Sequence, residues 1–182
     1  CTAAKVCDRY YRNSGKRRKP AKDGKLYVSA IFDCYDLLPV GLAMADHMRA
    51  ELCCETLKYA NLRFSKIRGA IVHSDRGRQY TSAAYRAVIQ KYGIVQSMNR
   101  AGGRCHDNAR CESIWARMKE ELFYHRGRKT EHYKMEELKF MVWRYFMSYW
   151  SNRRICSSIG GLSPTVKRQR FYAAVAVARF AS

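Results

Sequence analysis

The chain lacks any apolar run long enough to cross a membrane, because no hydrophobic segment approaches the roughly 20 residues of a spanning helix. It also lacks the apolar centre of a secretory signal, since its first 24 residues are basic. Acidic residues are scarce, with 15 Asp and Glu against 35 Lys and Arg. We therefore expect a cytoplasmic protein without a membrane partner.

No regular spacing relates the eight cysteines, and a chain of 182 residues without an export signal favours reduced thiols over a disulfide framework. Cys105, His106 and Cys111 could suggest a zinc site. No second cysteine pair or distal histidine pair stands at zinc-finger spacing, so we expect ordinary thiols.

The basic charge is unevenly distributed along what we expect to be one globular domain, without repeats or a dividing linker. Residues 1–24 carry eight basic and two acidic groups, residues 25–60 carry three and five, and residues 61–182 carry twenty-four and eight. The last two thirds therefore favour a polyanion, with a merely well-solvated surface as the alternative.

Hydrophobic patterning predicts an α/β domain with a mixed central sheet. The expected strands are 26–33, 37–45, 67–73 and 94–98. Helices are expected over 49–59, 83–92, 107–124, 135–154 and 163–180, with Ser82 capping the second and Pro164 opening the last.

Two acids stand where chemistry could occur. Asp75 follows the strand ending at 73, and open α/β sheets bind ligands beyond the carboxyl ends of their strands. Arg76, Arg78 and Gln79 follow it and could hold phosphates, although an aspartate here is often only a turn residue. Glu112 lies early in the 107–124 helix, on nearly the same face as Lys119, and simple helix pairing is the alternative. Carboxylates on a basic surface suggest two-metal phosphoryl transfer, which needs a third acid from the first strand.

Three segments carry a family resemblance: HSDRGRQYTS (73–82), YGIVQSMNRAGGRCHDNARCES (92–113) and RYFMSYWSNRRICSSIGGLSP (144–164). Together they resemble the integrase-core transposases of bacterial insertion sequences, over about residues 24–169. The resemblance implies a ribonuclease-H-like mixed sheet flanked by helices. It also implies a three-acid site holding two Mg²⁺ (or Mn²⁺) ions that cuts and joins DNA.

By this resemblance Asp75 is the second catalytic and metal-binding acid and Glu112 the third. The expected DNA contacts are Arg76, Arg78, Gln79, Arg104, Asn108 and Lys119. Thirty-six residues separate the two acids, one more than is usual in the family, and we place the extra residue in the Gly102–Gly103 loop. Cys156 stands where the family usually has histidine.

The family's first acid has no counterpart before Lys22, and Asp33 matches a second-strand aspartate that is not catalytic. We therefore expect the first strand to be missing or disrupted, and stability to be marginal. Residues 5–13 can be encoded by codons that, read one base downstream, spell Lys-Cys-Val-Thr-Asp-Ile-Thr-Glu. Residues 1–22 are thus interpreted as an aberrant, possibly frame-shifted segment, residues 23–170 as the core and residues 171–182 as a helical tail. On this view the KRRK run at 16–19 arises by accident.

The leading hypothesis is a DNA-binding transposase core that is catalytically impaired because the first acid is missing. It would act on insertion-sequence ends and target DNA as a homo-oligomer in a transposition complex. The alternative is a non-catalytic module that binds DNA or pairs with intact transposase subunits. A ribonuclease H would share the fold but lacks the flanking motifs.

Overall fold

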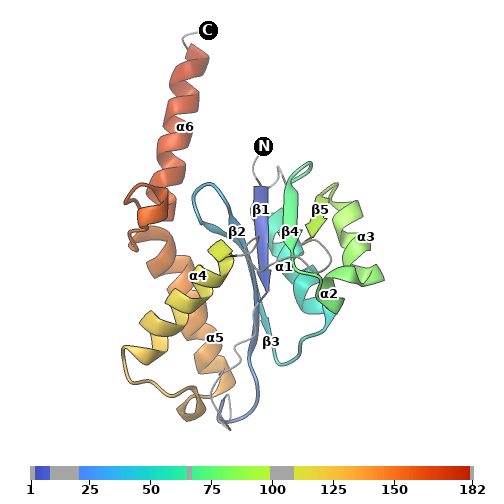
Figure 1. Ribbon diagram of the computed structural model, residues 1–182, viewed down its shortest axis with the longest axis vertical. Helices are drawn as coiled ribbons and strands as arrows, with labels where there is room; N and C mark the ends of the chain where they lie inside the picture. Colours follow the sequence, from blue (N-terminus) through green and yellow to red (C-terminus); the bar gives the residue numbers. More distant parts are fainter. Residues whose placement is uncertain (1–2, 9–20, 65–66, 99–108, 181–182) are drawn as a thin grey trace.

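The computed structural model describes residues 3–8, 21–64, 67–98 and 109–180, and in this part of the chain five strands form one sheet (Figure 1). They are β1 (Ala3–Asp8), β2 (Tyr27–Asp33), β3 (Pro39–Ala45), β4 (Ile71–Ser74) and β5 (Val95–Met98). The order is β3-β2-β1-β4-β5, in which β1, β2 and β3 are antiparallel and β4 and β5 run parallel to β1. The mixed sheet expected from the sequence is confirmed.

The expectation of a missing or disrupted first strand is wrong. β1 occupies the middle of the sheet, where Lys5 lies opposite Phe32 of β2 on one side and His73 of β4 on the other. The sequence prediction rested on the pattern of side chains. A central strand also pairs its main-chain N–H and C=O groups with both neighbouring strands, and any extended segment without proline can do this. The predicted marginal stability therefore loses its physical basis.

Except for Arg78–Thr81, where the sequence pattern predicted no helix, the helices agree with that pattern to within a few residues. They are α1 (Ala50–Arg63), α2 (Arg78–Thr81), α3 (Ala83–Lys91), α4 (Ala109–Lys119), α5 (Met135–Arg144) and α6 (Pro164–Phe180). A first π-helical turn, Glu120–Tyr124, continues α4, and a second, Tyr145–Trp150, continues α5. Short 3₁₀ turns cover Thr130–His132 and Ser157–Ile159. Ser82 caps α3 as predicted, because its Oγ accepts the Tyr85 N–H at 3.2 Å.

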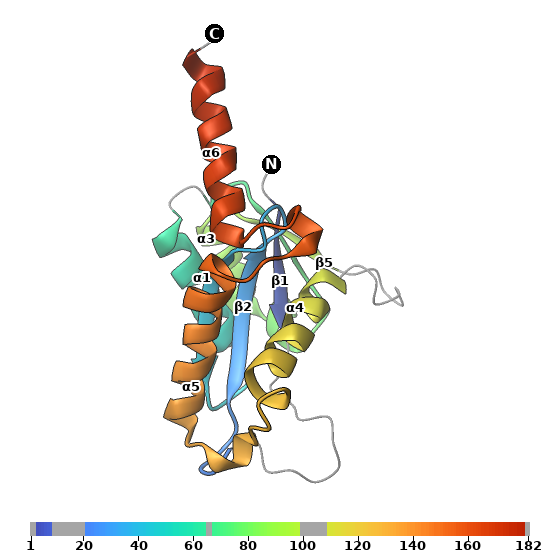
Figure 2. The same ribbon diagram turned by 90° about the vertical axis from the view of Figure 1, so that its left-hand side faces the viewer.

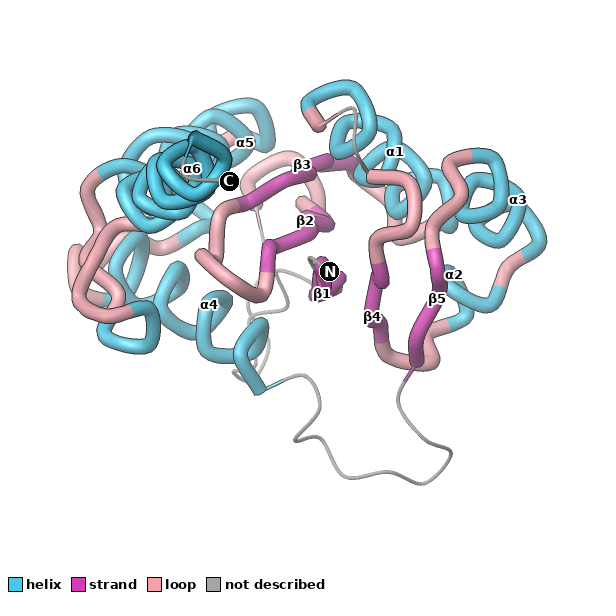
Figure 3. The backbone as a smooth tube through the Cα atoms, turned by 90° about the horizontal axis from the view of Figure 1, so that it is seen from above, coloured by secondary structure: helices cyan, strands magenta, loops and turns pink. Residues whose placement is uncertain are grey.

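The helices cover the two faces of the sheet. Figure 3 shows α1 and α3 on one side and α4 and α5 on the other. On the first side α1 approaches β3 closely at Gly41, where a Cβ atom would lie 2.5 Å from the carbonyl oxygen of Thr56. On the second side Trp115 of α4 packs edge-on against Phe32 and Phe146, with ring centroids 6.2 and 5.3 Å apart. Each face of the sheet therefore has its own apolar core.

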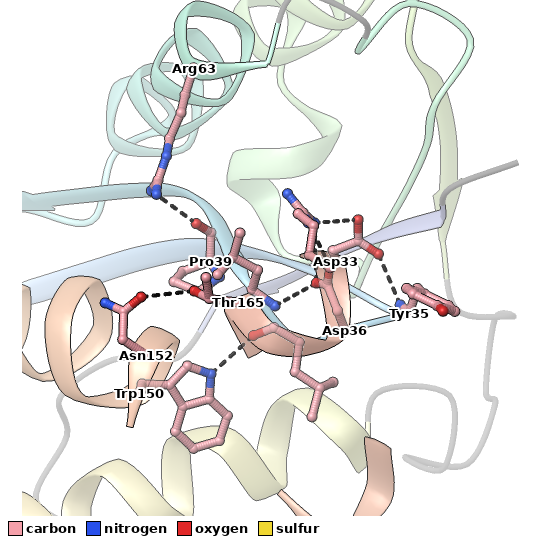
Figure 4. Close-up of polar contacts among 11 residues, drawn as sticks. Asp33, Tyr35, Asp36, Pro39, Arg63, Trp150, Asn152 and Thr165 are labelled. Atoms are coloured by element: carbon pink, nitrogen blue, oxygen red, sulfur yellow. Dashed lines mark hydrogen bonds and ion pairs between the residues drawn. The ribbon is translucent and has the colours of Figure 1, made fainter. Parts of the chain in front are cut away.

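A buried ion cluster fixes the start of α6 to the turn between β2 and β3. Arg168 pairs with Asp33 at 2.8 Å and also with Asp36, and these two aspartates lie together in the turn (Figure 4). Trp150 donates its indole N–H to the carbonyl of Leu37 in the same turn at 3.0 Å. Beyond this anchor α6 extends away from the rest of the protein (Figures 1 and 2).

Candidate functional site

Asp75 is positioned by the end of β4 and by a tight loop. The strand places Val72 and Ser74 in the interior, and Asp75 follows immediately, partly buried. Its Oδ1 accepts the N–H of Gly77 at 2.7 Å. A Cβ atom at Gly77 would lie 2.9 Å from that oxygen and 2.6 Å from Nε2 of Gln79, so this close approach requires glycine. One carboxylate oxygen of Asp75 is therefore held in a defined direction.

The residues after Asp75 divide between surface and interior. Arg76 and Arg78 are exposed beside the acid, where the sequence placed phosphate contacts. Gln79 is only 8% exposed and packs against Gly77. This burial suits support of the loop better than contact with DNA. Next to it Tyr80 is fully buried and its carbonyl accepts a hydrogen bond from Gln96 at 2.9 Å, which ties the loop to β5.

Glu112 lies in the first turn of α4, the helix that contacts β1 on the second face of the sheet. Cys111, Trp115 and Met118 bury the inner side of α4, which leaves Glu112 half-buried at its margin. Glu112 and Lys119 line one pocket of about 450 Å³, as their seven-residue spacing predicts. Its other lining residues are Trp115, Ala116, Glu120, Tyr124 and His125.

The two acids come from elements that meet at the central strand. Asp75 directly follows β4, which pairs with one side of β1, and Glu112 belongs to α4, which packs on β1. Arg110 secures the start of α4, because its Nη1 donates to the carbonyl of Cys34 at 2.8 Å. Arg104 and Asn108, two of the expected DNA contacts, lie outside the described residues.

A divalent-ion site needs more donors than these two carboxylates. Within residues 21–64, 67–98 and 110–180, the part of the chain whose side chains are described, no group of three His, Cys, Asp or Glu side chains comes close enough to hold a metal ion. The described donors therefore do not fit a complete two-metal site. Asp8 is the last residue of β1, the strand that pairs with β4. Asp33, by contrast, is occupied by Arg168, and burial raises the pKa of its carboxyl against the opposing effects of the Tyr35 N–H and Arg168.

One polar cluster near α4 was not found from the sequence. Glu121 accepts hydrogen bonds from Arg154 Nε at 2.9 Å and from the Tyr145 hydroxyl at 2.8 Å, and it forms an ion pair with Arg154 Nη2 at 2.8 Å. Burial, with Glu121 adding to it, raises the pKa of Tyr145. Arg154 also donates to the buried Cys156 Sγ at 3.5 Å. The residue that replaces the family's histidine is therefore part of this structural cluster. The only sign of this cluster in the sequence was the Arg-Arg-Ile-Cys run at residues 153–156.

Comparisons with known proteins agree on one family. The integrase core domain family matches residues 14–105, a span that includes Asp75 and ends before Glu112. "Transposase InsF for insertion sequence IS3A" of Escherichia coli (strain K12) is 35% identical over 143 residues, covering 78% of this chain and 48% of that protein. The insertion element IS600 uncharacterized 31 kDa protein of Shigella sonnei is 32% identical over 154 residues, covering 83% and 54%. The chain thus spans about half the length of these relatives.

Solved structures show the same fold at low identity. The catalytic core domain of BIV integrase superposes with a TM-score of 0.61 at 12% identity, covering 95% of this chain and 97% of that one. The HTLV-2 integrase catalytic core domain, in complex with magnesium, gives 0.54 at 10% identity, covering 89% and 92%. The ribonuclease-H-like fold expected from the sequence is confirmed. None of the helices in the described part of the chain is long and apolar enough to span a membrane.

Proposed function

Because the chain belongs to the integrase core domain family, we propose that it is the core of an insertion-sequence transposase and binds DNA in the bacterial cytoplasm. The observation that carries this proposal is the placement of Asp75 at the carboxyl end of β4 and of Glu112 on α4, where α4 and β4 both contact β1. In an open α/β sheet this end is where ligands bind. Its DNA substrates would be insertion-sequence ends and target DNA.

The side chains around the two acids suit a DNA strand. Arg76 and Arg78 are exposed next to Asp75, and Lys119 lines the pocket of Glu112. Cations in these positions would attract backbone phosphates and release counterions, so that the affinity depends strongly on salt. Gln79 and the Gly77 N–H would act indirectly, by holding the Asp75 loop in place.

We further propose that strand cleavage is impaired in this chain. The family's chemistry uses Mg²⁺ or Mn²⁺, and the solved relative bound to magnesium supports such an ion, yet the side chains described in residues 21–64, 67–98 and 110–180 bring no third carboxylate to Asp75 and Glu112. A divalent ion would then bind weakly. Removing one member of a catalytic unit typically costs several orders of magnitude in rate.

The alternative is a non-catalytic module that binds DNA or pairs with intact transposase subunits. The incomplete donor set among the described residues favours it. A homo-oligomer is proposed in either case, because a chain in a solved simian T-cell lymphotropic virus intasome has a similar fold, with a TM-score of 0.62 at 8% identity, covering 89% of this chain and 52% of that one. Oligomeric pairing without chemistry would make the chain an inhibitor of its intact relatives.

Cleavage of labelled duplexes that carry the flanking terminal repeats distinguishes these functions. We expect the purified chain to bind DNA in a salt-dependent manner but not to nick it with Mg²⁺ or Mn²⁺. A variant with residues 5–12 replaced by Lys-Cys-Val-Thr-Asp-Ile-Thr-Glu, the sequence of the shifted frame, should gain cleavage that Glu112→Gln removes. Cleavage by the unmodified chain, abolished by Glu112→Gln, would refute the impairment. If Asp8→Asn also abolished it, Asp8 would be the third acid.

Sequencing the locus tests the frame hypothesis independently. Codons for residues 5–13 that cannot spell the motif in any shifted frame would exclude it. In that case residues 1–22 are native, and the impairment would have another origin.

A further inference from the structure

A groove of about 520 Å³ lies between the first π-helical turn and the helix formed by α5 and the second π-helical turn. Leu122, Tyr133 and Met141 line it and pack against the core, so they form its floor. The two helical runs that border it, α4 with its continuation and α5 with its continuation, lie next to each other in Figures 1 and 2. Neither Asp75 nor Glu112 lines this groove.

Four arginines give the groove a strong positive charge. They are Arg126, Arg128, Arg144 and Arg153. Within the described part of the chain, none of their guanidinium groups has a hydrogen-bonding or ion-pair partner. The one acid in the lining, Glu121, is already engaged by Arg154 and by the Tyr145 hydroxyl. The four charges are therefore available to an anionic ligand.

Exposed aromatic rings accompany these charges. Phe140 is 61% exposed and Tyr149 is 42% exposed, and both line the groove. Tyr149 is steadied by the buried Tyr145, whose ring centroid lies 5.5 Å away. Large apolar rings exposed beside unpaired guanidinium groups are unfavourable to leave in water and suit a ligand with flat faces and negative charges.

The groove is also bordered by both π-helical turns. Glu121 and Leu122 belong to the first, and Tyr145, Ser148 and Tyr149 belong to the second. The i→i+5 hydrogen bonds of such turns widen the helix and change the direction of the side chains that follow. Here the second turn is followed by Arg153, whose N–H bonds back to Tyr149. The two π-helical turns thus bring aromatic and basic side chains together in the lining of the groove.

We propose that this groove binds a single DNA strand, with phosphates paired to the arginines and bases stacked on Phe140 and Tyr149. A basic groove with aromatic platforms is the general arrangement for single-stranded nucleic acid. The first π-helical turn borders both this groove and the Glu112 pocket, because Glu120 and Tyr124 line the pocket whereas Glu121 and Leu122 line the groove. A strand that passes Lys119 can therefore continue into it. The proposal rests on the proposed DNA partner but not on cleavage.

Fluorescence anisotropy with a labelled 12-nucleotide oligo-dT and a duplex of equal length tests the groove. Arg126→Ala/Arg153→Ala should weaken oligo-dT binding at least tenfold and reduce the slope of log K against log[salt] by about 0.7 for each phosphate that is no longer neutralised. Tyr149→Ala should weaken oligo-dT binding about fivefold or more and change duplex binding little. The matched control is Arg68→Ala/Arg86→Ala, which removes two exposed arginines from outside the groove lining.

Photo-crosslinking of a 5-bromouracil oligonucleotide gives a second measurement, and the proposal expects the adduct on a peptide that contains Tyr149. Equal losses of affinity in the groove and control variants would overturn it, as would equal losses of single-stranded and duplex DNA binding in Tyr149→Ala. Unchanged DNA binding in every groove variant, the result expected if the partner is an acidic protein, would overturn it too. Because none of these measurements requires cleavage, an inactive chain can still confirm the groove. Circular dichroism verifies that each variant is folded.

Discussion

Replacing Arg168 by methionine is expected to lower the free energy of unfolding by about 3–5 kcal/mol at neutral pH. The guanidinium group joins α6 to the β2–β3 turn through Asp33 and Asp36, whose side chains are only 8% and 2% exposed. It also lies over the Phe64 ring, 5.0 Å from its centroid. Methionine keeps much of the apolar volume but leaves two buried carboxylates without their cation.

The magnitude follows from the charges that remain. Removing one partner of a buried ion cluster typically costs about 3–5 kcal/mol, because the other charge stays buried without compensation. For a chain of this size each kcal/mol shifts the melting temperature by about 2–4 °C, so a fall of about 6–20 °C is expected. Arg168→Lys keeps the charge but loses the fork that reaches both carboxylates, so its loss should be smaller.

The pH dependence of the deficit provides a sharper test. Burial raises the pKa of Asp33, so the folded state binds the carboxyl proton more tightly than the unfolded state does. The free energy of unfolding therefore falls as the pH rises above 3.8, the ordinary pKa of an aspartate. Arg168 lowers the pKa of Asp33 by its positive charge, so its loss raises this pKa further and widens the pH range over which stability falls. The deficit of Arg168→Met should therefore be smallest near pH 4 and largest at neutral pH.

Urea denaturation followed by tryptophan fluorescence measures both effects, because Trp115 and Trp150 are buried in the core beside this turn. The triple variant Arg168→Met/Asp33→Asn/Asp36→Asn is the control, since it removes the buried charges together and should recover most of the loss. A deficit below about 1 kcal/mol, or one that is independent of pH, would show that the cluster does not anchor α6.

Two further substitutions test the packing and the polar cluster beside α4. Gly41→Ala should cost about 1–3 kcal/mol in urea denaturation, because its Cβ would meet the Thr56 carbonyl at 2.5 Å, and a neutral effect would refute this close approach. Glu121→Gln should lower the pKa of Tyr145, although burial still holds it above its ordinary value of 10.0, as ultraviolet titration of the phenolate can measure. Because a raised tyrosine pKa makes stability fall above about pH 10, the variant should lose less stability there than the wild type, and an unchanged titration would contradict the Tyr145–Glu121 contact.

Local patterns account for the elements and motifs that the sequence predicted correctly. The run rich in Tyr, Val and Ile in residues 26–33 and the Ser82 cap before residues 83–92 are local signals, so β2 and α3 were placed to within a residue or two. Asp75 and Glu112 stay predictions of the same local kind, since each stands in a short motif beside a recognisable strand or helix. The first strand was missed because its position depends on main-chain pairing with two distant strands and not on its own pattern.

The sequence by itself therefore determined the family, the mixed sheet and two of the candidate acids. Only the tertiary structure decided which charges are neutralised within the protein and which remain available to a partner. Arg154 pairs with Glu121, 33 residues away, and Arg168 pairs with Asp33, 135 residues away, while Arg126 and Arg153 line an open groove. All four arginines look alike in the sequence. The energy of a charge depends on its burial and its partners, and both are set by long-range packing.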